Sequence, residues 1–482
     1  MLPELGFHFD NTYLRDLEGF YARGTAEPAP SPRLIKLNQP LATELGLNAE
    51  ALNSETGAAI FSGNLAPEGA ALIAQAYAGH QFGGFVPQLG DGRALMLGEL
   101  IDTQGQRRDI QFKGSGRTPF SRGGDGKAAL GPVLREYILG EAMHALGIPT
   151  TRALAAVTTG QQVFREGMLP GAVLTRVAAS HIRVGTFQFF ATGGQYDKIK
   201  QLAIYTIQRH YPHVASHSNP FLSLLNAVID RQAALIANWM QVGFIHGVMN
   251  TDNMALSGET IDYGPCAFMD HYDPDTVFSS IDRNGRYAYG QQPSIARWNL
   301  ARLAETLLPL IDTDEKAAIA AATAAINNFT DLYDQYWLKG MNAKLGIPPA
   351  SELSIANGFL AAMEGQHADY SLAFRALAPA ATGNDEPIKQ LFDNSAAYVA
   401  WAETWRALNP NPQQILATNP LYIPRNHEVE AALTAAVTNN DLAPFEQLLE
   451  VLSQPFIERP GLERFTLPAP RNSQPYRTFC GT

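Results

Sequence analysis

The sequence predicts an α+β protein in which a strand-rich region is followed by a helix-rich region. From about residue 79 to residue 126 glycines are dense and the apolar runs are short, which is typical of strands joined by tight turns. From about residue 181 onward, long segments with helical periodicity dominate. No internal repeat interrupts this order. The two observations together predict two lobes, one built on a sheet and one on helices.

Composition and charge exclude several classes of protein. The chain has 482 residues, of which 46% are hydrophobic, enough for one large or two medium cores. Its formal net charge is -11, so a nucleic acid would gain no counterion-release energy on binding, and we expect no nucleic-acid partner. No apolar run reaches the roughly 18 residues of a membrane span. The N-terminus has neither signal-peptide nor transit-peptide character, which predicts a cytoplasmic location.

Short strands and glycine-rich turns fill the first region. We expect strands over residues 94–100, 107–113 and 152–177. The turn "LGDGRA" precedes the first of them, and the loop "SRGGDGKAA" follows the second. Backbone amides in such loops can bind phosphate or ribose, although turns of this kind are more often purely structural.

Helices follow with recognisable ends. The segment 132–147 has apolar residues at helical spacing, with Pro132 suited to the first helical position and Gly147 to the stop. Helical periodicity also predicts helices over residues 219–244, 298–311 and 314–346. The Asn- and Pro-rich stretch that ends near residue 430 is interpreted as a loop, followed by one more helix and a tail.

The stretch "HGVMNTDNMALSGETIDYG" concentrates oxygen donors around a turn. We expect "SGE" to close a hairpin that brings Asn253 and Asp262 within about 5 Å of each other as cross-strand neighbours. An amide oxygen beside a carboxylate suits a hard cation such as Mg²⁺, and Asp252 supplies a third oxygen donor. The alternative is a polar surface hairpin without a metal.

Two further pairs have the chemistry of phosphate binding. Lys113 ends a predicted strand and Glu136 lies on the next helix, an arrangement that kinases use to hold the phosphates of ATP. Lys–Glu spacings of this kind also occur by chance. If the segment from Arg176 to Arg183 is helical, its two guanidinium groups lie two turns apart and point the same way, where they match phosphate oxygens. Ordinary solvated arginines fit the sequence equally well.

The order of these parts resembles that of protein kinases. His246 matches the histidine of the kinase catalytic loop, Asn253 its metal-binding asparagine, and Asp262 the aspartate of the D-F-G motif. The aspartate that serves kinases as base is replaced by Val248, which cannot accept a proton. The metal apparatus is therefore present without the usual base.

Over most of its length the chain resembles the selenoprotein O (SelO) family of protein adenylyltransferases. The resemblance implies an atypical kinase fold with an N-terminal extension (1–75), a kinase-like N-lobe (76–175), a C-lobe with the metal loop (176–330), and a helical C-terminal extension with a redox tail (331–482). The motifs that carry it are "YAGHQFG", "QLGDGRA", "QFKGSGRTPFSRGGDGKA", "LREYILGEAMHALGIPTTRAL", "TRVAASHIRVGTFQ", "HGVMNTDNM", "IDYGPCAFMD" and "YRTFCGT".

This resemblance implies a reaction in which ATP binds in a reversed orientation. AMP, and not phosphate, is then transferred to Ser, Thr or Tyr hydroxyls of target proteins, redox-related ones among them, with Mg²⁺ or Mn²⁺ as cofactor and the protein acting as a monomer. A kinase that uses Asp252 as base, and a non-catalytic scaffold that binds ATP, are the alternatives.

By the same resemblance each candidate residue receives a role. Lys113 and Glu136 form an ion pair, and Asp252 is the proton acceptor. Asn253 and Asp262 hold the metal. The nucleotide-binding residues are Gly90, Gly92, Arg93, Lys113, Asp125, Gly126, Arg176, Arg183 and Asp262, of which the last two arginines grip the γ-phosphate.

The two cysteines, Cys266 and Cys480, complete the set. Some members of the family have selenocysteine at the position of Cys480, which implies redox chemistry in the tail. Since Cys266 follows the metal loop, a Cys266–Cys480 disulfide would clamp the tail over the active site. Two free thiols, the usual state in a reducing compartment, are the alternative.

Overall fold

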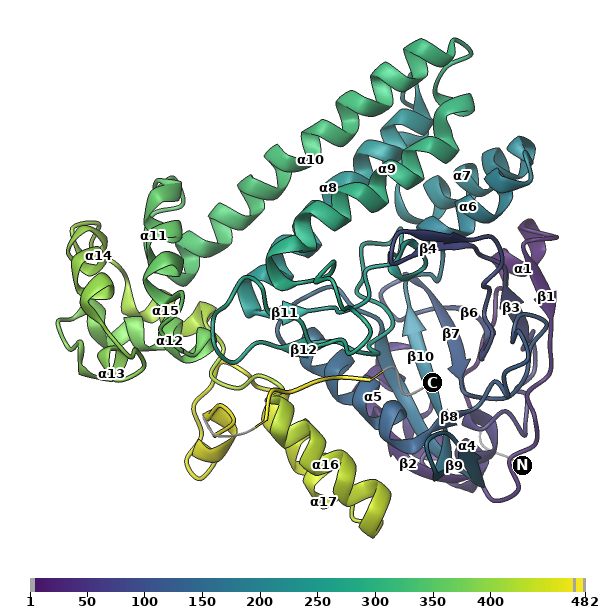
Figure 1. The fold of residues 1–482 in the computed structure, drawn as a ribbon. Coiled ribbons are helices and arrows are strands. Elements are labelled where there is room, and N and C mark those ends of the chain that lie inside the picture. Colours follow the sequence, from purple (N-terminus) through teal and green to yellow (C-terminus); the bar gives the residue numbers. More distant parts are fainter. Residues whose placement is uncertain (1–4, 471–473, 480–482) are drawn as a thin grey trace.

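An antiparallel sheet dominates the first part of the chain in the computed structural model, which describes residues 5–470 and 474–479 (Figure 1). The strand order is β1-β3-β6-β7-β10-β9-β2, and β8 pairs with β10. The strands predicted near residues 94, 107 and 152 are confirmed. The strands are β1 (Tyr21–Arg23), β2 (Arg33–Leu37), β3 (Ile73–Gln75), β6 (Ala94–Ile101), β7 (Arg107–Lys113), β8 (Ala128–Ala129), β9 (Arg152–Phe164) and β10 (Met168–Ala178).

Helices cover both faces of this sheet. On one face α5 (Leu130–Ala145) packs its apolar side against alanines and leucines of β9 and β10, as the period of its sequence predicts. It begins before Pro132 and ends with Gly147 in a left-handed conformation (φ +78°), so its predicted stop is confirmed. The opposite face packs against three short helices, α2 (Gln39–Glu44), α3 (Ala49–Leu52) and α4 (Glu55–Phe61).

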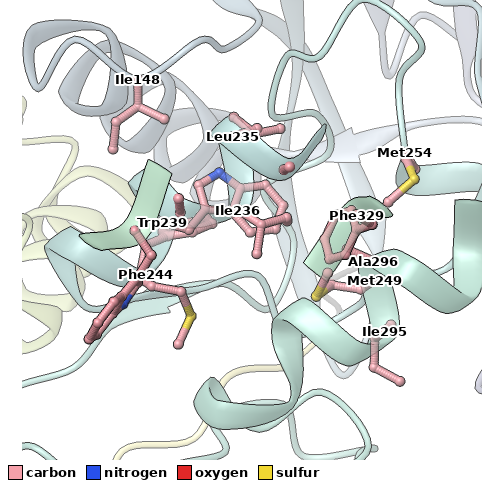
Figure 2. Close-up of a cluster of buried hydrophobic side chains, with 14 of the residues drawn as sticks. Ile148, Leu235, Ile236, Trp239, Phe244, Met249, Met254, Ile295, Ala296 and Phe329 are labelled. Atoms are coloured by element: carbon pink, nitrogen blue, oxygen red, sulfur yellow. The ribbon is translucent and has the colours of Figure 1, made fainter. Parts of the chain in front are cut away.

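Long helices form the second part, as predicted. Figure 1 shows α8, α9 and α10 lying side by side, away from the sheet. Their shared core includes Trp239, Ile236 and Phe329, which Figure 2 shows in one cluster with Phe244 of a short two-stranded ladder. The elements are α6 (Val184–Thr192), α7 (Tyr196–His210), α8 (Pro220–Val242), α9 (Gln292–Ile311) and α10 (Glu315–Lys344), with the ladder β11 (Phe244–Ile245) and β12 (Ala267–Phe268).

The C-terminal part is more helical than the sequence indicates. The stretch interpreted as a loop contains α15, because the Asn411 side chain accepts hydrogen bonds from the first backbone amides and Pro412 stands at the first helical position. Two helices follow it, not one, and both pack on α5. The helices here are α11 (Leu353–Met363), α12 (Tyr370–Ala381), α13 (Glu386–Lys389), α14 (Ala396–Arg406), α15 (Pro412–Thr418), α16 (Asn426–Asn439) and α17 (Ala443–Leu452).

The predicted α+β class is confirmed, because an antiparallel sheet comes first and helices follow. Strands β1, β2 and β3, all from the first 75 residues, belong to the same sheet as β6 and β7. The division into four segments stays a prediction. Within residues 5–470 and 474–479, no helix combines the length and the apolar character needed to cross a membrane.

Candidate active site

A cleft of about 790 Å³ lies where the sheet meets the helical part. Strands β7 and β10 contribute Lys113 and Arg176 to its lining, and the chain after β11 contributes Asp252 and Asp262. Glu136 does not line the cleft but contacts the side chains that do. Candidate residues that line it are Gly90, Gly92, Arg93, Lys113, Asp125, Gly126, Arg176, Arg183, Asp252, Asn253 and Asp262.

Asp262 is the centre of the charged cluster. Its Oδ1 atom lies 2.8 Å from Lys113 Nζ and 2.7 Å from Arg176 Nη1, and its Oδ2 atom lies 2.9 Å from Arg183 Nη1. Both arginine side chains are only 2% exposed. Burial alone raises the pKa of Asp262, but the three positive charges outweigh it and hold that pKa well below the ordinary value. The carboxylate therefore stays ionised at neutral pH.

Strand pairing explains why these residues meet. On β7 and β10, Gln111 stands opposite Arg176 and Lys113 opposite Leu174, so the basic residues lie on neighbouring strands. Glu136, from α5, binds Lys113 Nζ at 2.6 Å and Arg176 Nη1 at 3.2 Å. The predicted Lys113–Glu136 pair thus forms, and Arg176 joins it.

The segment between the two arginines is not a helix. Arg176 lies in β10, and Arg183 is the N-cap of α6, so the chain between them leaves the sheet before a helix begins. Strand pairing with β7 and β9 outweighs any local helical preference of the segment. The guanidinium groups still converge, because both reach Asp262.

The predicted hairpin around "SGE" is wrong. Residues 254–256 and 260–262 do not pair with each other; Ala255 forms a bridge with Arg183, and Thr260 forms a parallel bridge with Thr150. The backbone groups of this segment are thus satisfied by the chain before α6 and the chain after α5. The two ends of the loop are brought together instead by the β11–β12 ladder.

The donor set in this loop fits a magnesium ion. Asn253 follows Thr251 and Asp252 in a 3-10 turn, η2 (Thr251–Asn253), and donates its amide nitrogen to Val248 O (2.9 Å), which leaves the amide oxygen for a cation. Among the described residues no three His, Cys, Asp or Glu side chains are grouped so as to hold a metal. Magnesium typically needs only one or two protein oxygens, with phosphate and water supplying the others. Asn253 and the ionised Asp262 both line the cleft and offer oxygens of this kind.

Asp252, next to Asn253 in the chain, is buried and incompletely hydrogen-bonded. It is 7% exposed, and its Oδ1 atom has no hydrogen-bond partner among the described residues. Burial raises the pKa of Asp252 to about 6. A Cβ atom on Gly185 would lie 3.3 Å from Asp252 Cα and 2.1 Å from Ala78 O, so the backbone around Asp252 packs closely against a position that only glycine can occupy.

His246 and Val248 shape the loop. The His246 Nε2–H group donates to Ile261 O at 2.9 Å, and its ring stacks on Trp239 (Figure 2 shows Trp239 in the surrounding core). Burial lowers the pKa of His246, which keeps it neutral in this role. Val248 lines the cleft where kinases carry their base.

Two glycine loops line the other end of the cleft. Gly90 (φ +67°) lies against Phe120, and a Cβ atom there would come within 2.3 Å of the ring. A Cβ atom added to Gly126 (φ +67°) would likewise lie too close to a backbone carbonyl oxygen. Asp125 binds Arg165 through both carboxylate oxygens at 2.9 and 3.0 Å, which ties the second loop to the end of β9.

Several residues of the cleft were not singled out from the sequence. Asp91 is buried and lies 3.8 Å from Arg183, while the ring of Tyr77 lies 4.5 Å below the same guanidinium. Burial raises the pKa of Asp91. Both residues stand inside motifs of the family resemblance, "YAGHQFG" and "QLGDGRA", but neither received a role of its own from the sequence. Gln111 and Arg165 had no local signal, since their partners are distant in the chain.

Cys266 is fully buried, and burial raises the pKa of its thiol to about 12. Cys480 lies outside the described residues, so the disulfide stays a prediction. The tail before it does approach the metal loop: Thr478 donates to Pro265 O at 2.7 Å and forms a bridge with Ser279.

Comparison with known proteins identifies the family of this chain. The family described as "Protein adenylyltransferase SelO" matches residues 3–453. The chain is 61% identical to "Protein nucleotidyltransferase YdiU" of Cereibacter sphaeroides (strain KD131), over 99% of this chain and 100% of that protein. It is 54% identical to the protein of that name from Mycolicibacterium paratuberculosis, over 100% and 99% of the two chains, and 56% identical to that of Rhizobium meliloti, over 99% of each. The chain therefore belongs to the protein adenylyltransferase SelO family.

Proposed function

We propose that this nucleotidyltransferase binds ATP with its γ-phosphate deep in the cleft and transfers AMP to Ser, Thr or Tyr hydroxyls of other proteins. The observation that carries the proposal is the pair of arginines, Arg176 and Arg183, which are almost completely buried behind Asp262. Guanidinium groups bind phosphate oxygens through two parallel hydrogen bonds. Their depth suits the outer phosphates of a reversed nucleotide.

The charge at the cleft floor supports pyrophosphate as the leaving group. Lys113, Arg176 and Arg183 bring three positive charges together around Asp262. Pyrophosphate carries more negative charge than a transferred phosphoryl group, and stabilising charge as it develops is the main task in phosphate transfer. A γ-phosphoryl transfer would instead need its last phosphate near the cleft mouth.

Asp252 supplies the base in this reading. The acceptor hydroxyl gives its proton to the Asp252 carboxylate as its oxygen bonds to the α-phosphorus. The bond from the α-phosphorus to the bridging oxygen of pyrophosphate then breaks. A general base of this kind contributes about 10²–10⁴ in rate. Asn253 and Asp262 would hold Mg²⁺ or Mn²⁺, which when bound neutralises phosphate charge.

We also propose a two-lobed kinase-like architecture, a cytoplasmic location, a monomeric state and redox-related proteins among the acceptors. The pairing of a strand lysine with a helix glutamate supports the first.

The decisive experiment uses ATP labelled separately at the α and γ positions. We expect the α label to become bound to protein and the γ label to leave as pyrophosphate, with both lost in Asp262→Ala. Protein-bound γ label would mean a kinase that uses Asp252 as base. Nucleotide binding with neither label on protein would mean a scaffold.

A further inference from the structure

One part of the cleft wall has no role in the reaction so far. The motif "YAGHQFG" forms a hairpin of β4 (Gly79–Gln81) and β5 (Gly84–Val86). The hairpin lies directly on Asp252: Gln81 Nε2 donates to Asp252 Oδ2 at 3.3 Å, and a Cβ atom on Gly79 would lie 2.3 Å from Asp252 Oδ1. The hairpin backbone thus covers one carboxylate oxygen. Since Gln81 lines the cleft, its amide holds the other oxygen on the cleft side.

Hydrogen bonds from backbone amides of the hairpin to side chains fix it to the loop that carries Asp252. His80 N donates to Thr251 Oγ1 at 2.7 Å, and Phe82 N donates to Asn250 Oδ1 at 3.1 Å. Hairpin and loop therefore form one unit, and the side chains of the turn keep a fixed place relative to the carboxylate.

The turn of this hairpin is strained and exposes an aromatic ring. Gln81 pairs with Gly84, which leaves Phe82 and Gly83 as a two-residue turn with φ values of +51° and +84°. Asn, Asp or Gly normally occupy both positions of such a turn, and another residue costs roughly 1–2 kcal/mol. Phe82 nevertheless stays 36% exposed and lines the cleft, 5.0 Å from the ring of Tyr287. A strained aromatic residue that is only partly buried and borders the cleft points to a role in binding.

We propose that this hairpin is the acceptor side of the active site and selects acceptors with an apolar residue next to the modified hydroxyl. Phe82 contacts that apolar residue, together with Ile281, a second exposed apolar side chain that lines the cleft. Gln81 is a positioning residue that orients Asp252 toward the hydroxyl. The occupant is a segment of the acceptor protein, because the rings border the same cleft as the base. The inference rests on the proposed AMP transfer.

The test uses two synthetic peptides that differ only in having Leu or Gly beside a central serine, with α-labelled ATP and the full chain. We expect kcat/KM to favour the Leu peptide about tenfold, the effect of burying one large apolar side chain. Phe82→Ala should remove the preference and leave KM for ATP unchanged. Phe82→Asn should do the same although Asn tolerates the turn, which separates the ring from the strain.

Phe85→Ala is the matched control, since Phe85 is on the same hairpin and equally exposed but does not line the cleft. It should keep the preference. Gln81→Leu should lower kcat roughly tenfold with both KM values unchanged, as expected when a partner that orients a reactive group is lost. A merely structural role would instead lower the unfolding temperature and raise KM for ATP.

Each remaining outcome overturns the inference. Labelling of both peptides without a preference, or a preference that survives Phe82→Ala, overturns the acceptor role of the hairpin alone. If no peptide or protein takes up the α label, the proposed AMP transfer fails and the inference falls with it.

Discussion

Asp262 and Asp270 lie on either side of β12, and each forms ion pairs with buried arginine. Asp262 binds Arg176 and Arg183 in the cleft, whereas Asp270 shares Arg425 with Asp369 among the C-terminal helices, at 2.6 Å for each carboxylate. The side chains of the two aspartates are similarly exposed, 20% and 16%. Burial and ion pairing alone therefore do not distinguish a functional site from a structural one.

The difference between the two clusters lies in what surrounds their buried arginines. Two carboxylates bind Arg425, and Thr466 O accepts a further hydrogen bond from it at 2.7 Å. The protein itself therefore neutralises the positive charge of Arg425. Around Asp262 three cations, Lys113, Arg176 and Arg183, border an open cleft. Buried cations next to a cavity indicate a ligand of the opposite sign, here a polyphosphate.

The largest expected effect separates the two aspartates directly. Asp262→Asn should lower AMP transfer roughly 10³-fold, because it removes the proposed metal ligand and the partner of three cations that are proposed to bind the phosphates. Asp270→Asn should leave kcat of the folded protein within about twofold, since it contacts no cleft residue. Transfer of α-labelled phosphate measures both. Comparable losses in the two variants would break the comparison.

Substituting Arg425 should lower the stability of the protein and leave its activity unchanged. Arg425→Met leaves Asp270 and Asp369 buried without their cation, which should lower the free energy of unfolding by roughly 3–5 kcal/mol. Urea unfolding measures this, and transfer per folded molecule should be unchanged. Arg464→Ala, which removes an exposed arginine, should cost less than about 1 kcal/mol. A large loss of kcat in Arg425→Met would contradict the structural role.

The proposed metal site sharpens the comparison on the cleft side. Asn253→Ala should raise the Mg²⁺ concentration for half-maximal transfer roughly 10–100-fold, and a chelator should abolish transfer in both proteins. Asn299 is a matched control, because it is a buried asparagine whose amide donates to Met249 O at 2.9 Å. Asn299→Ala should lower the unfolding temperature without changing the Mg²⁺ dependence. An unchanged requirement in Asn253→Ala would argue against this ligand.

A buried lysine extends the comparison to a cation that forms no ion pair with a carboxylate within residues 5–470 and 474–479. Lys344 of α10 bonds to Asn419 Oδ1 at 2.7 Å and lies over the ring of Phe374, and burial lowers the pKa of Lys344 from 10.5 to about 7. Between these values the unfolded chain binds more protons, so the free energy of unfolding should rise with pH above 7, by at most about 1.4 kcal/mol per pH unit.

Urea unfolding at pH 7 and pH 9 tests this dependence. Lys344→Met should remove most of the rise, whereas Lys339→Met, on the exposed side of the same helix, should keep it. Parallel pH curves for Lys344→Met and the wild type would show that the lysine does not titrate in this range.

The smallest effect is expected at the rim of the cleft. The pair of Arg165 and Asp125 is partly exposed, 18% and 40% for the two side chains, so solvent weakens it. Arg165→Ala should raise KM for ATP about threefold by loosening the glycine loop, and change stability by less than about 1 kcal/mol. Steady-state kinetics would measure the shift. A loss as large as that of Asp262→Asn would mean that Arg165 contacts the phosphates.

The sequence allowed the composition of the cleft to be predicted better than its geometry. The order strand lysine, helix glutamate, metal loop is written along the chain, so Lys113, Glu136 and Asp262 were found from spacing and resemblance. The local structure between Arg176 and Arg183 was not, because pairing with distant strands decides it. The Arg425 cluster has no local signal in the sequence, since Asp270, one of its two aspartates, lies 155 residues from the arginine. Long-range partners are what a single sequence conceals.

The base of the proposed reaction is seated between two residues that have no side chain. At Gly79 an added methyl group would overlap the Asp252 carboxylate, and at Gly185 it would overlap a backbone carbonyl next to it. Alanine scanning normally treats such positions as silent or skips them. In this protein, a library built only on polar residues would overlook two of the substitutions best suited to disable the enzyme while leaving every reactive group in place.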